Sequence, residues 1–127
     1  MDEYGLHAPS AGPGGQPPVR SRAVGRCTLV ELHGDIDIAV VPWLVEQLDA
    51  ATEAAAPCVV VDLRAVTFLD CSGLGLLCRA RRRAREREGR LSLLCTDPAV
   101  LRLLRVTRLL RAFDLLEPPC RPECPVA

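Results

Sequence analysis

The sequence predicts one α/β domain in which helices cover a sheet in two or three layers. Strand-like and helix-like segments alternate along the chain, and the connections between them are short. The 127 residues, 49% of them hydrophobic, suffice for one core but not for two domains. Because only 3% are aromatic, that core must be built from aliphatic side chains.

Proline and glycine gather at the two ends of the chain. Residues 1–23 show almost no apolar periodicity and predict a disordered arm. Residues 118–127 hold four prolines and predict an irregular tail. We therefore expect the domain at residues 24–117.

The domain is expected to open with a strand followed by a helix. Residues 26–38 alternate with a two-residue period, which predicts a half-buried strand or strand pair that Gly34 bends or ends. Apolar residues then recur at helical spacing from Val41 to Ala55, and Pro42 suits a first helical turn. An amphipathic helix is predicted there.

The middle of the domain repeats this order. Residues 58–63 are nearly all apolar and β-branched at three positions, as expected for a central parallel strand covered on both faces and followed by a short turn. A weaker helical stripe runs from Cys71 to about Glu88, and Gly89 is a signal for the end of that helix.

The last elements follow the same pattern. Residues 90–95 predict a strand, and Asp97 followed by Pro98 predicts the start of a third helix. Residues 113–116 are expected to form a short final strand.

The charge composition excludes several classes of partner and reaction. Sixteen acidic residues balance sixteen basic ones, so no overall field favours nucleic acid or an anionic membrane. All basic residues are arginine, which excludes Schiff-base and Walker-type chemistry. The arginine run from Arg79 to Arg90 suggests nucleic acid, but no aromatic residue interleaves it. With Glu86 and Glu88 near for pairing, a solvated helix face is favoured over a docking surface for an acidic partner.

The cysteines and the N-terminus predict a reducing, cytoplasmic location. The seven cysteines are odd in number and include no C-x-x-C, and the acidic N-terminus has no apolar export region. Cys58, Cys78 and Cys95 fall on apolar faces and are interpreted as packing residues. Cys120 and Cys124 are assigned no role.

Metal binding and membrane insertion are not expected. His7 and His33 each lack a second ligand at metal spacing. No apolar run approaches the ~20 residues of a membrane-spanning helix. No cofactor is expected.

The informative stretch is Val59–Leu77, where a buried strand leads into Asp70-Cys71-Ser72-Gly73 at the start of a helix. Partners of open α/β sheets meet the chain at such strand ends, and free N–H groups there favour a phosphate. Ser72 is accordingly either a phosphorylation site or a helix N-cap. Cys71 is either an oxidant-sensitive thiol or a small buried residue.

This stretch resembles the STAS domain of anti-sigma factor antagonists. The family pattern is an apolar strand, Asp-Leu, a spacer ending in Phe, then Asp-Ser-Ser-Gly-Leu-Gly and a helix. Here it is Asp62-Leu63, Phe68 and Asp70-Cys71-Ser72-Gly73-Leu74-Gly75. Gly34 to Asp37, Gly89 to Leu91 and Asp97 to Val100 match further family segments, so the resemblance covers about residues 27–117.

The resemblance implies a small mixed sheet of four or five strands with helices mainly on one face. It also implies a binding protein that is not an enzyme. Its partner would be an anti-sigma factor, often a serine kinase of the GHKL type, whose capture releases a sigma factor. A phosphatase would reverse phosphorylation by that kinase. The implied partner-binding residues are Asp37, Asp70, Cys71, Ser72, Gly73, Leu74 and Gly75.

The chain departs from the family where Cys71 replaces the phosphorylated serine. This departure leaves three alternatives. Phosphorylation has moved to Ser72, the antagonist is always active, or the protein is controlled by oxidation of Cys71. A different class of function is a STAS subunit that docks on an ABC-transporter ATPase.

The carboxylates of Asp37 and Asp70 could also meet at one sheet edge. Such a pair suits acid–base chemistry or Mg²⁺, but the resemblance favours an acidic rim that recognises the partner. No combination of nucleophile, base and orienting residue suggests catalysis.

Overall fold

The computed structural model describes residues 18–109 and 113–116. They form a five-stranded sheet in the order β1-β2-β3-β4-β5, in which β1 is antiparallel to β2 and every other pair is parallel. The elements are β1 (Val19–Val24), β2 (Cys27–Ile36), η1 (Ile38–Val40), α1 (Val41–Ala51), β3 (Cys58–Leu69), α2 (Cys71–Glu86), β4 (Arg90–Leu94), α3 (Pro98–Val106) and β5 (Asp114–Leu116).

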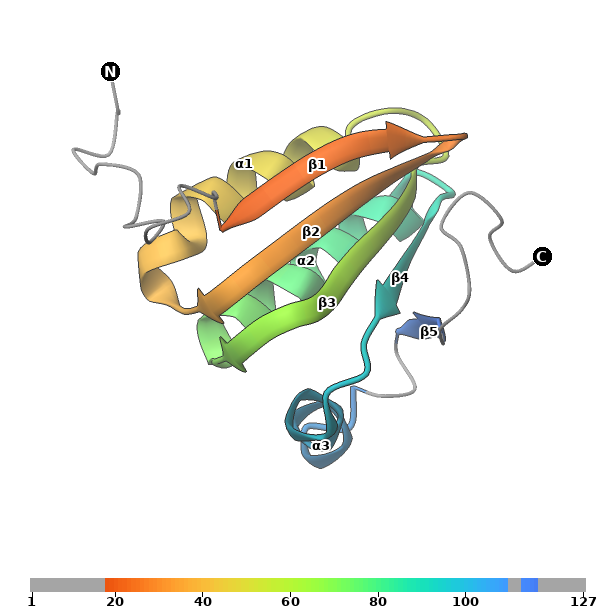
Figure 1. Ribbon diagram of the computed structural model, residues 1–127. Coiled ribbons are helices and arrows are strands. Elements are labelled where there is room, and N and C mark those ends of the chain that lie inside the picture. The colour runs from red at the N-terminus through yellow and green to blue at the C-terminus, as the bar shows by residue number, and fades with distance from the viewer. Residues whose placement is uncertain (1–17, 110–112, 117–127) are drawn as a thin grey trace, which may run out of the picture.

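The expected fold class, a mixed sheet with helices mainly on one face, is confirmed. Helices α1 and α2 lie side by side behind the sheet in Figure 1, α1 against β1 and β2 and α2 against β3 and β4. Helix α3 lies beyond the end of β4 (Figure 1). The core between sheet and helices is aliphatic, with fully buried residues such as Leu32, Leu48, Leu63, Leu77 and Leu93.

Strand β1 corrects the expected start of the domain. Residues 19–23, which we assigned to an arm, pair with β2 across the turn at Gly25 and Arg26, where Gly25 has a φ of 62°. Only Val19 of this edge strand is buried, so the strand carries almost no apolar periodicity. Residues 1–17 of the expected arm and the tail 118–127 lie outside the described residues.

Strand β3 corrects the expected turn after Leu63. The strand continues to Leu69 and stays paired with β2, so that Ile36 and Leu69 are opposite each other. Shifts in register around Gly34, whose φ is 75°, keep the two strands together. As a result β2 and β3 end at one edge of the sheet.

Helix α2 ends close to the expected place, but Gly89 has a different role there. The residue with positive φ is Glu88, at 61°, and the N–H of Gly89 donates to the carbonyl of Ala84. A Cβ on Gly89 would lie 2.1 Å from the carbonyl oxygen of Pro57. Gly89 therefore permits close approach of β4 to the segment before β3, and the left-handed conformation is carried by Glu88.

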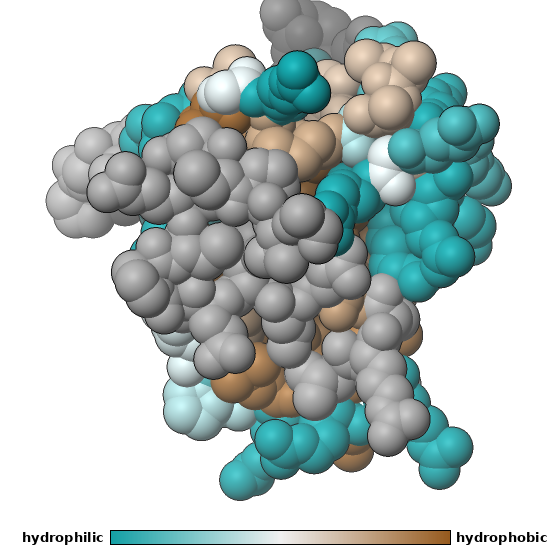
Figure 2. Space-filling model, turned by 90° about the vertical axis from the view of Figure 1, so that its right-hand side faces the viewer, coloured by the Kyte–Doolittle hydropathy of each residue, from teal (hydrophilic) through white to brown (hydrophobic). Residues whose placement is uncertain are grey.

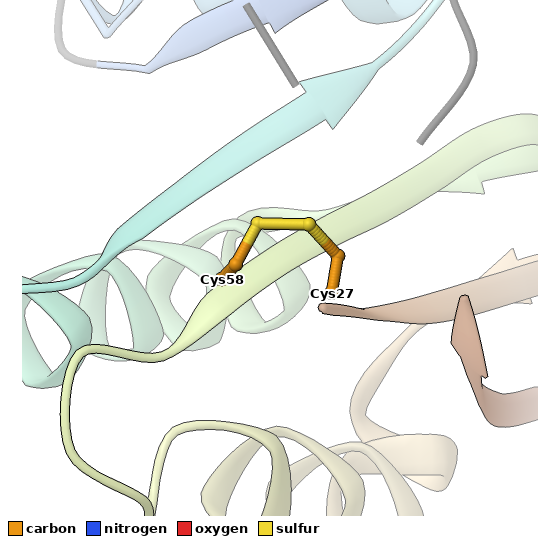
Figure 3. Close-up of a disulfide and its surroundings, with 2 residues drawn as sticks. All are labelled: Cys27 and Cys58. Atoms are coloured by element: carbon orange, nitrogen blue, oxygen red, sulfur yellow. A yellow bond between two sulfur atoms is a disulfide. The ribbon is translucent and has the colours of Figure 1, made fainter. Parts of the chain in front are cut away.

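A disulfide joins Cys27 and Cys58, the first residues of β2 and β3 (Figure 3). Our interpretation of Cys58 as a packing residue alone is therefore wrong. Parallel pairing of β2 with β3 brings the two Cα atoms to 4.6 Å, which the spacing of cysteines in the sequence cannot show. Cys71, Cys78 and Cys95 are free thiols. Within the described residues no helix is long and apolar enough to cross a membrane.

Candidate functional site

Two capping carboxylates lie at the edge where β2 and β3 end. Asp37 Oδ1 accepts a hydrogen bond from the N–H of Ala39 at 3.0 Å and caps η1. Asp70 Oδ1 accepts from the N–H of Gly73 at 3.1 Å and caps α2. Because Ile36 and Leu69 pair, the residues that follow them reach the same edge, as the sequence predicts for Asp37 and Asp70.

The hydrogen bonds of Asp37 and Asp70 show that both carboxylates act as helix caps. Each holds the first turn of a helix, whose N–H groups favour negative charge. A third carboxylate, that of Asp35, accepts a hydrogen bond from the Thr67 hydroxyl at 2.7 Å. Residues 18–109 and 113–116 contain no group of three His, Cys, Asp or Glu side chains that could hold a metal ion. The arrangement is an acidic rim around the start of α2.

Cys71 and Ser72 occupy the first two positions of α2. The Cys71 side chain is exposed, so the interpretation of Cys71 as a small buried residue is wrong. Ser72 is half-buried. The interpretation of Ser72 as the N-cap is wrong, because Asp70 precedes the helix and its side chain reaches the third N–H. The Ser72 hydroxyl forms no hydrogen bond within the described part of the chain.

The two glycines of this turn have opposite surroundings. A Cβ on Gly73 would lie 2.7 Å from Leu69 Cδ1 and 2.8 Å from Ile36 Cγ2, so only glycine lets α2 begin this close to the strands. A Cβ on Gly75 would meet nothing within 4 Å. Leu74 is buried in the core and Gly75 is exposed. Gly73 and Leu74 thus position the site, while Gly75 is open to a partner.

Sequence reasoning did not assign two exposed apolar residues to this edge. Ile38 is 73% exposed directly after Asp37, and Phe68 is 52% exposed directly before Leu69. Phe68 pairs with Asp35 across the sheet and Ile38 follows Asp37 in the chain, so each exposed apolar side chain comes from a position next to a carboxylate. A mixture of apolar and charged groups suits a protein interaction site. The sequence carries no clear signal for Ile38, because it is a single apolar residue in the short turn before α1. We name as the docking edge the residues Asp37, Ile38, Phe68, Asp70, Cys71, Ser72 and Gly75.

Asp62, which the family motif contains, lies in mid-strand away from this edge. Its buried carboxylate accepts from Arg64 Nε at 3.0 Å and from Arg64 Nη2 at 2.9 Å. Burial alone would raise the pKa of Asp62, but the hydrogen bonds and charge of Arg64 outweigh it and lower that pKa below 3.8. The role of Asp62 is therefore structural.

The arginine run on α2 does more than form a solvated face. Arg79 pairs with Asp49 of α1, and Arg83 Nε donates to Thr52 Oγ1 at 3.0 Å. The acidic partner in this contact is Asp49 instead of the expected Glu86 and Glu88. These arginines hold α2 against α1.

Comparisons with known proteins agree with this fold. A family model described as "Mlab, STAS domain" matches residues 19–117. An anti-sigma factor antagonist from Mycobacterium paratuberculosis has a TM-score of 0.70 and 26% identity, over 80% of this chain and 85% of that chain.

Two further solved structures show the fold alone. A STAS domain protein from Planctomyces limnophilus, titled an anti-sigma-factor antagonist, has a TM-score of 0.70 and 22% identity, over 78% of this chain and 88% of that chain. A sulfate transporter family protein from Wolinella succinogenes has a TM-score of 0.58 and 20% identity, over 68% of this chain and 70% of that chain. No curated protein sequence matches the chain significantly.

Proposed function

The chain belongs to the STAS-domain family, and on that premise we propose that it is an anti-sigma factor antagonist. It binds an anti-sigma factor through the docking edge and so releases a sigma factor for transcription. The observation that carries the proposal is the pairing of exposed apolar side chains, Ile38 and Phe68, with the acidic rim of Asp37 and Asp70. We place the protein in the cytoplasm, where it acts by binding and catalyses no reaction, and the disulfide between Cys27 and Cys58 is then an exception to the usual reduction of cytoplasmic thiols.

The chemistry of the docking edge specifies the partner surface. Ile38 and Phe68 require an apolar patch, and the carboxylates beside them favour basic side chains around it. Gly75 lets the backbone of the partner approach α2 closely, since nothing fills the space above it. An anti-sigma factor is the proposed partner, on the likeness to the mycobacterial antagonist. The GHKL serine-kinase type is proposed on the sequence resemblance alone.

The site also bears on how the antagonist is controlled. Cys71 is exposed at the first position of α2 and offers a thiol to a kinase that transfers phosphate to a hydroxyl. The nearby hydroxyl of Ser72 is half-buried. We propose that the protein binds its partner constantly, without the phosphorylation switch. Phosphorylation of Ser72 and oxidation of Cys71 are the alternatives that experiment must distinguish.

The first experiment is capture of partners from a cell extract of the source organism on the immobilised full chain. Mass spectrometry then identifies the captured proteins and the state of Ser72. A GHKL-type kinase with unmodified Ser72 supports an always-active antagonist. Phosphorylated Ser72 overturns the constant-binding part of the proposal. If no anti-sigma factor is among the captured proteins, the proposed antagonist function is overturned.

A second candidate function is supported by one comparison. A similar structure is a sulfate transporter family protein, so a STAS fold like this one also occurs in a transporter family. In this case the docking edge would contact an ABC-transporter ATPase. Capture of such an ATPase in the same experiment would favour this function over the first.

A further inference from the structure

A cavity of about 510 Å³ lies further along α2, between that helix and the side chains of Leu109 and Phe113. Its lining consists of Cys78, Arg81, Arg82, Arg85, Glu86, Leu109 and Phe113. None of these residues belongs to the docking edge. The volume falls within the range of about 300–1,000 Å³ that is usual for small-molecule sites.

One side of the cavity is cationic. Arg81, Arg82 and Arg85 follow each other at helical spacing, and among the described residues of the lining Glu86 is the single carboxylate. Within residues 18–109 and 113–116, these three arginines form no ion pair or hydrogen bond, whereas Arg79 on the flank of α2 is paired with Asp49. Hydrophilic side chains gather on the right of Figure 2, the side on which the helices lie.

The other side of the cavity is apolar. Phe113 is only 3% exposed, and its N–H donates to the carbonyl of Leu109 at 3.3 Å, so the two residues are held together. Cys78 completes this side. Burial raises the pKa of the Cys78 thiol, although the charges of Arg81 and Arg82 act against it, so the thiol is neutral at pH 7.

We propose that this cavity binds a small amphipathic anion. A phosphate or carboxylate group lies against Arg81, Arg82 and Arg85, and an apolar chain or ring lies on Leu109 and Phe113. Arginine forks match the planar and tetrahedral oxygens of such groups, and unpaired guanidinium groups have no protein partner to give up on binding. The site is independent of the proposed antagonist function, because it shares no residue with the docking edge.

Titration calorimetry of the full chain tests the site with octyl phosphate as the probe. Inorganic phosphate and octanol serve as the two halves of that molecule, and octanoate serves as the carboxylate form. The expected result is one site per chain for octyl phosphate or octanoate, bound at least about tenfold more tightly than either half. Failure of both amphiphiles to bind, or equal binding of inorganic phosphate, would overturn the proposal.

Variants locate the binding. Arg82→Gln and Arg85→Gln should each weaken binding by about tenfold, the effect of losing one charge-assisted contact. Arg22→Gln, an exposed arginine of the edge strand β1, is the matched control and should leave the affinity unchanged. Equal loss in all three variants would show a general charge effect and would contradict a site in the cavity.

Protection of a thiol gives a second readout. Saturating octyl phosphate should slow alkylation of Cys78 by iodoacetamide and leave alkylation of the exposed Cys71 unchanged. Tandem mass spectrometry separates the two positions. Unchanged reactivity of Cys78 under saturation would place the ligand elsewhere.

Discussion

The backbone N–H of Asp70 donates to the carbonyl oxygen of Ile36 at 3.3 Å, which ties the start of α2 to the end of β2. This bond also fixes the place of the residue that follows Ile36. The residue after Ile36 is Asp37, so the two capping carboxylates come to one edge of the sheet. The docking edge is thus a consequence of parallel pairing between β2 and β3.

Substitution of the two glycines of α2 should separate architecture from recognition. Gly73→Ala should lower the free energy of unfolding by about 1–3 kcal/mol, because its Cβ would overlap Leu69 and the stiff side chain of Ile36. Gly75→Ala meets open space and should raise that free energy by up to about 1 kcal/mol. Urea unfolding of both variants checks this. Equal effects would contradict the described packing.

The ion pair of Asp62 should make stability depend on pH. Asp62→Asn should lower the free energy of unfolding by about 1–3 kcal/mol at pH 7, since it leaves Arg64 without its buried carboxylate. The folded-state pKa of Asp62 lies below its ordinary value of 3.8. Its contribution is therefore complete above pH 3.8 and declines as pH falls through the folded-state value.

Unfolding curves of the wild type and Asp62→Asn across pH 2–7 measure this dependence. The difference between the two should shrink toward the acid end. Asp97→Asn, which alters an exposed helix cap, is the control for loss of one carboxylate. A constant difference across the whole range would show that the Asp62 charge is not responsible.

The disulfide between Cys27 and Cys58 should stabilise the fold strongly. The two cysteines are 31 positions apart in the sequence, and closing a loop of that length contributes about 3–4 kcal/mol in the chain-entropy model. The double variant Cys27→Ser and Cys58→Ser, or treatment with a reductant, should lower the free energy of unfolding by this order. Cys71→Ser, at an exposed free thiol, should change it little. A wild type that is indifferent to reductant would refute the bridge.

Restoring a hydroxyl at position 71 should restore phosphorylation. Cys71→Ser places it at the exposed first position of α2, the position that the sequence resemblance matches with the phosphorylated serine of the family. With ATP and the matching GHKL kinase, mass spectrometry should show phosphate on this variant but not on the wild type. Cys71→Ala is the control. If Cys71→Ser also stays unmodified, the cysteine is not the whole reason for the missing switch.

Most of the fold followed from periodicity, because helices α1, α2 and α3 each bury an apolar stripe and β3 and β4 are covered runs of apolar residues. Strand β1 did not follow, because an edge strand that buries only Val19 has almost no pattern. The extension of β3 to Leu69 was also missed, since its pairing with β2 is a tertiary feature.

The sequence predicted part of the candidate site, and the rest depended on tertiary structure. The motif placed Asp70 and Gly73 at a helix start, and the structure shows the contacts that require them. Ile38 was missed because a single apolar residue in a turn does not reveal whether it faces the core or solvent. Pairing of Cys27 with Cys58 needed the strand register, which local sequence does not contain.

The most direct test of the central claim is the affinity of the full chain for the proposed anti-sigma factor partner when Gly75 is blocked. Gly75→Tyr should weaken binding at least about tenfold without lowering the melting temperature, because Tyr would cover the open part of the docking edge. Ala50→Tyr adds the same ring at an exposed position of α1 outside the docking edge and should bind like the wild type. Unchanged binding by a folded Gly75→Tyr variant would contradict the account.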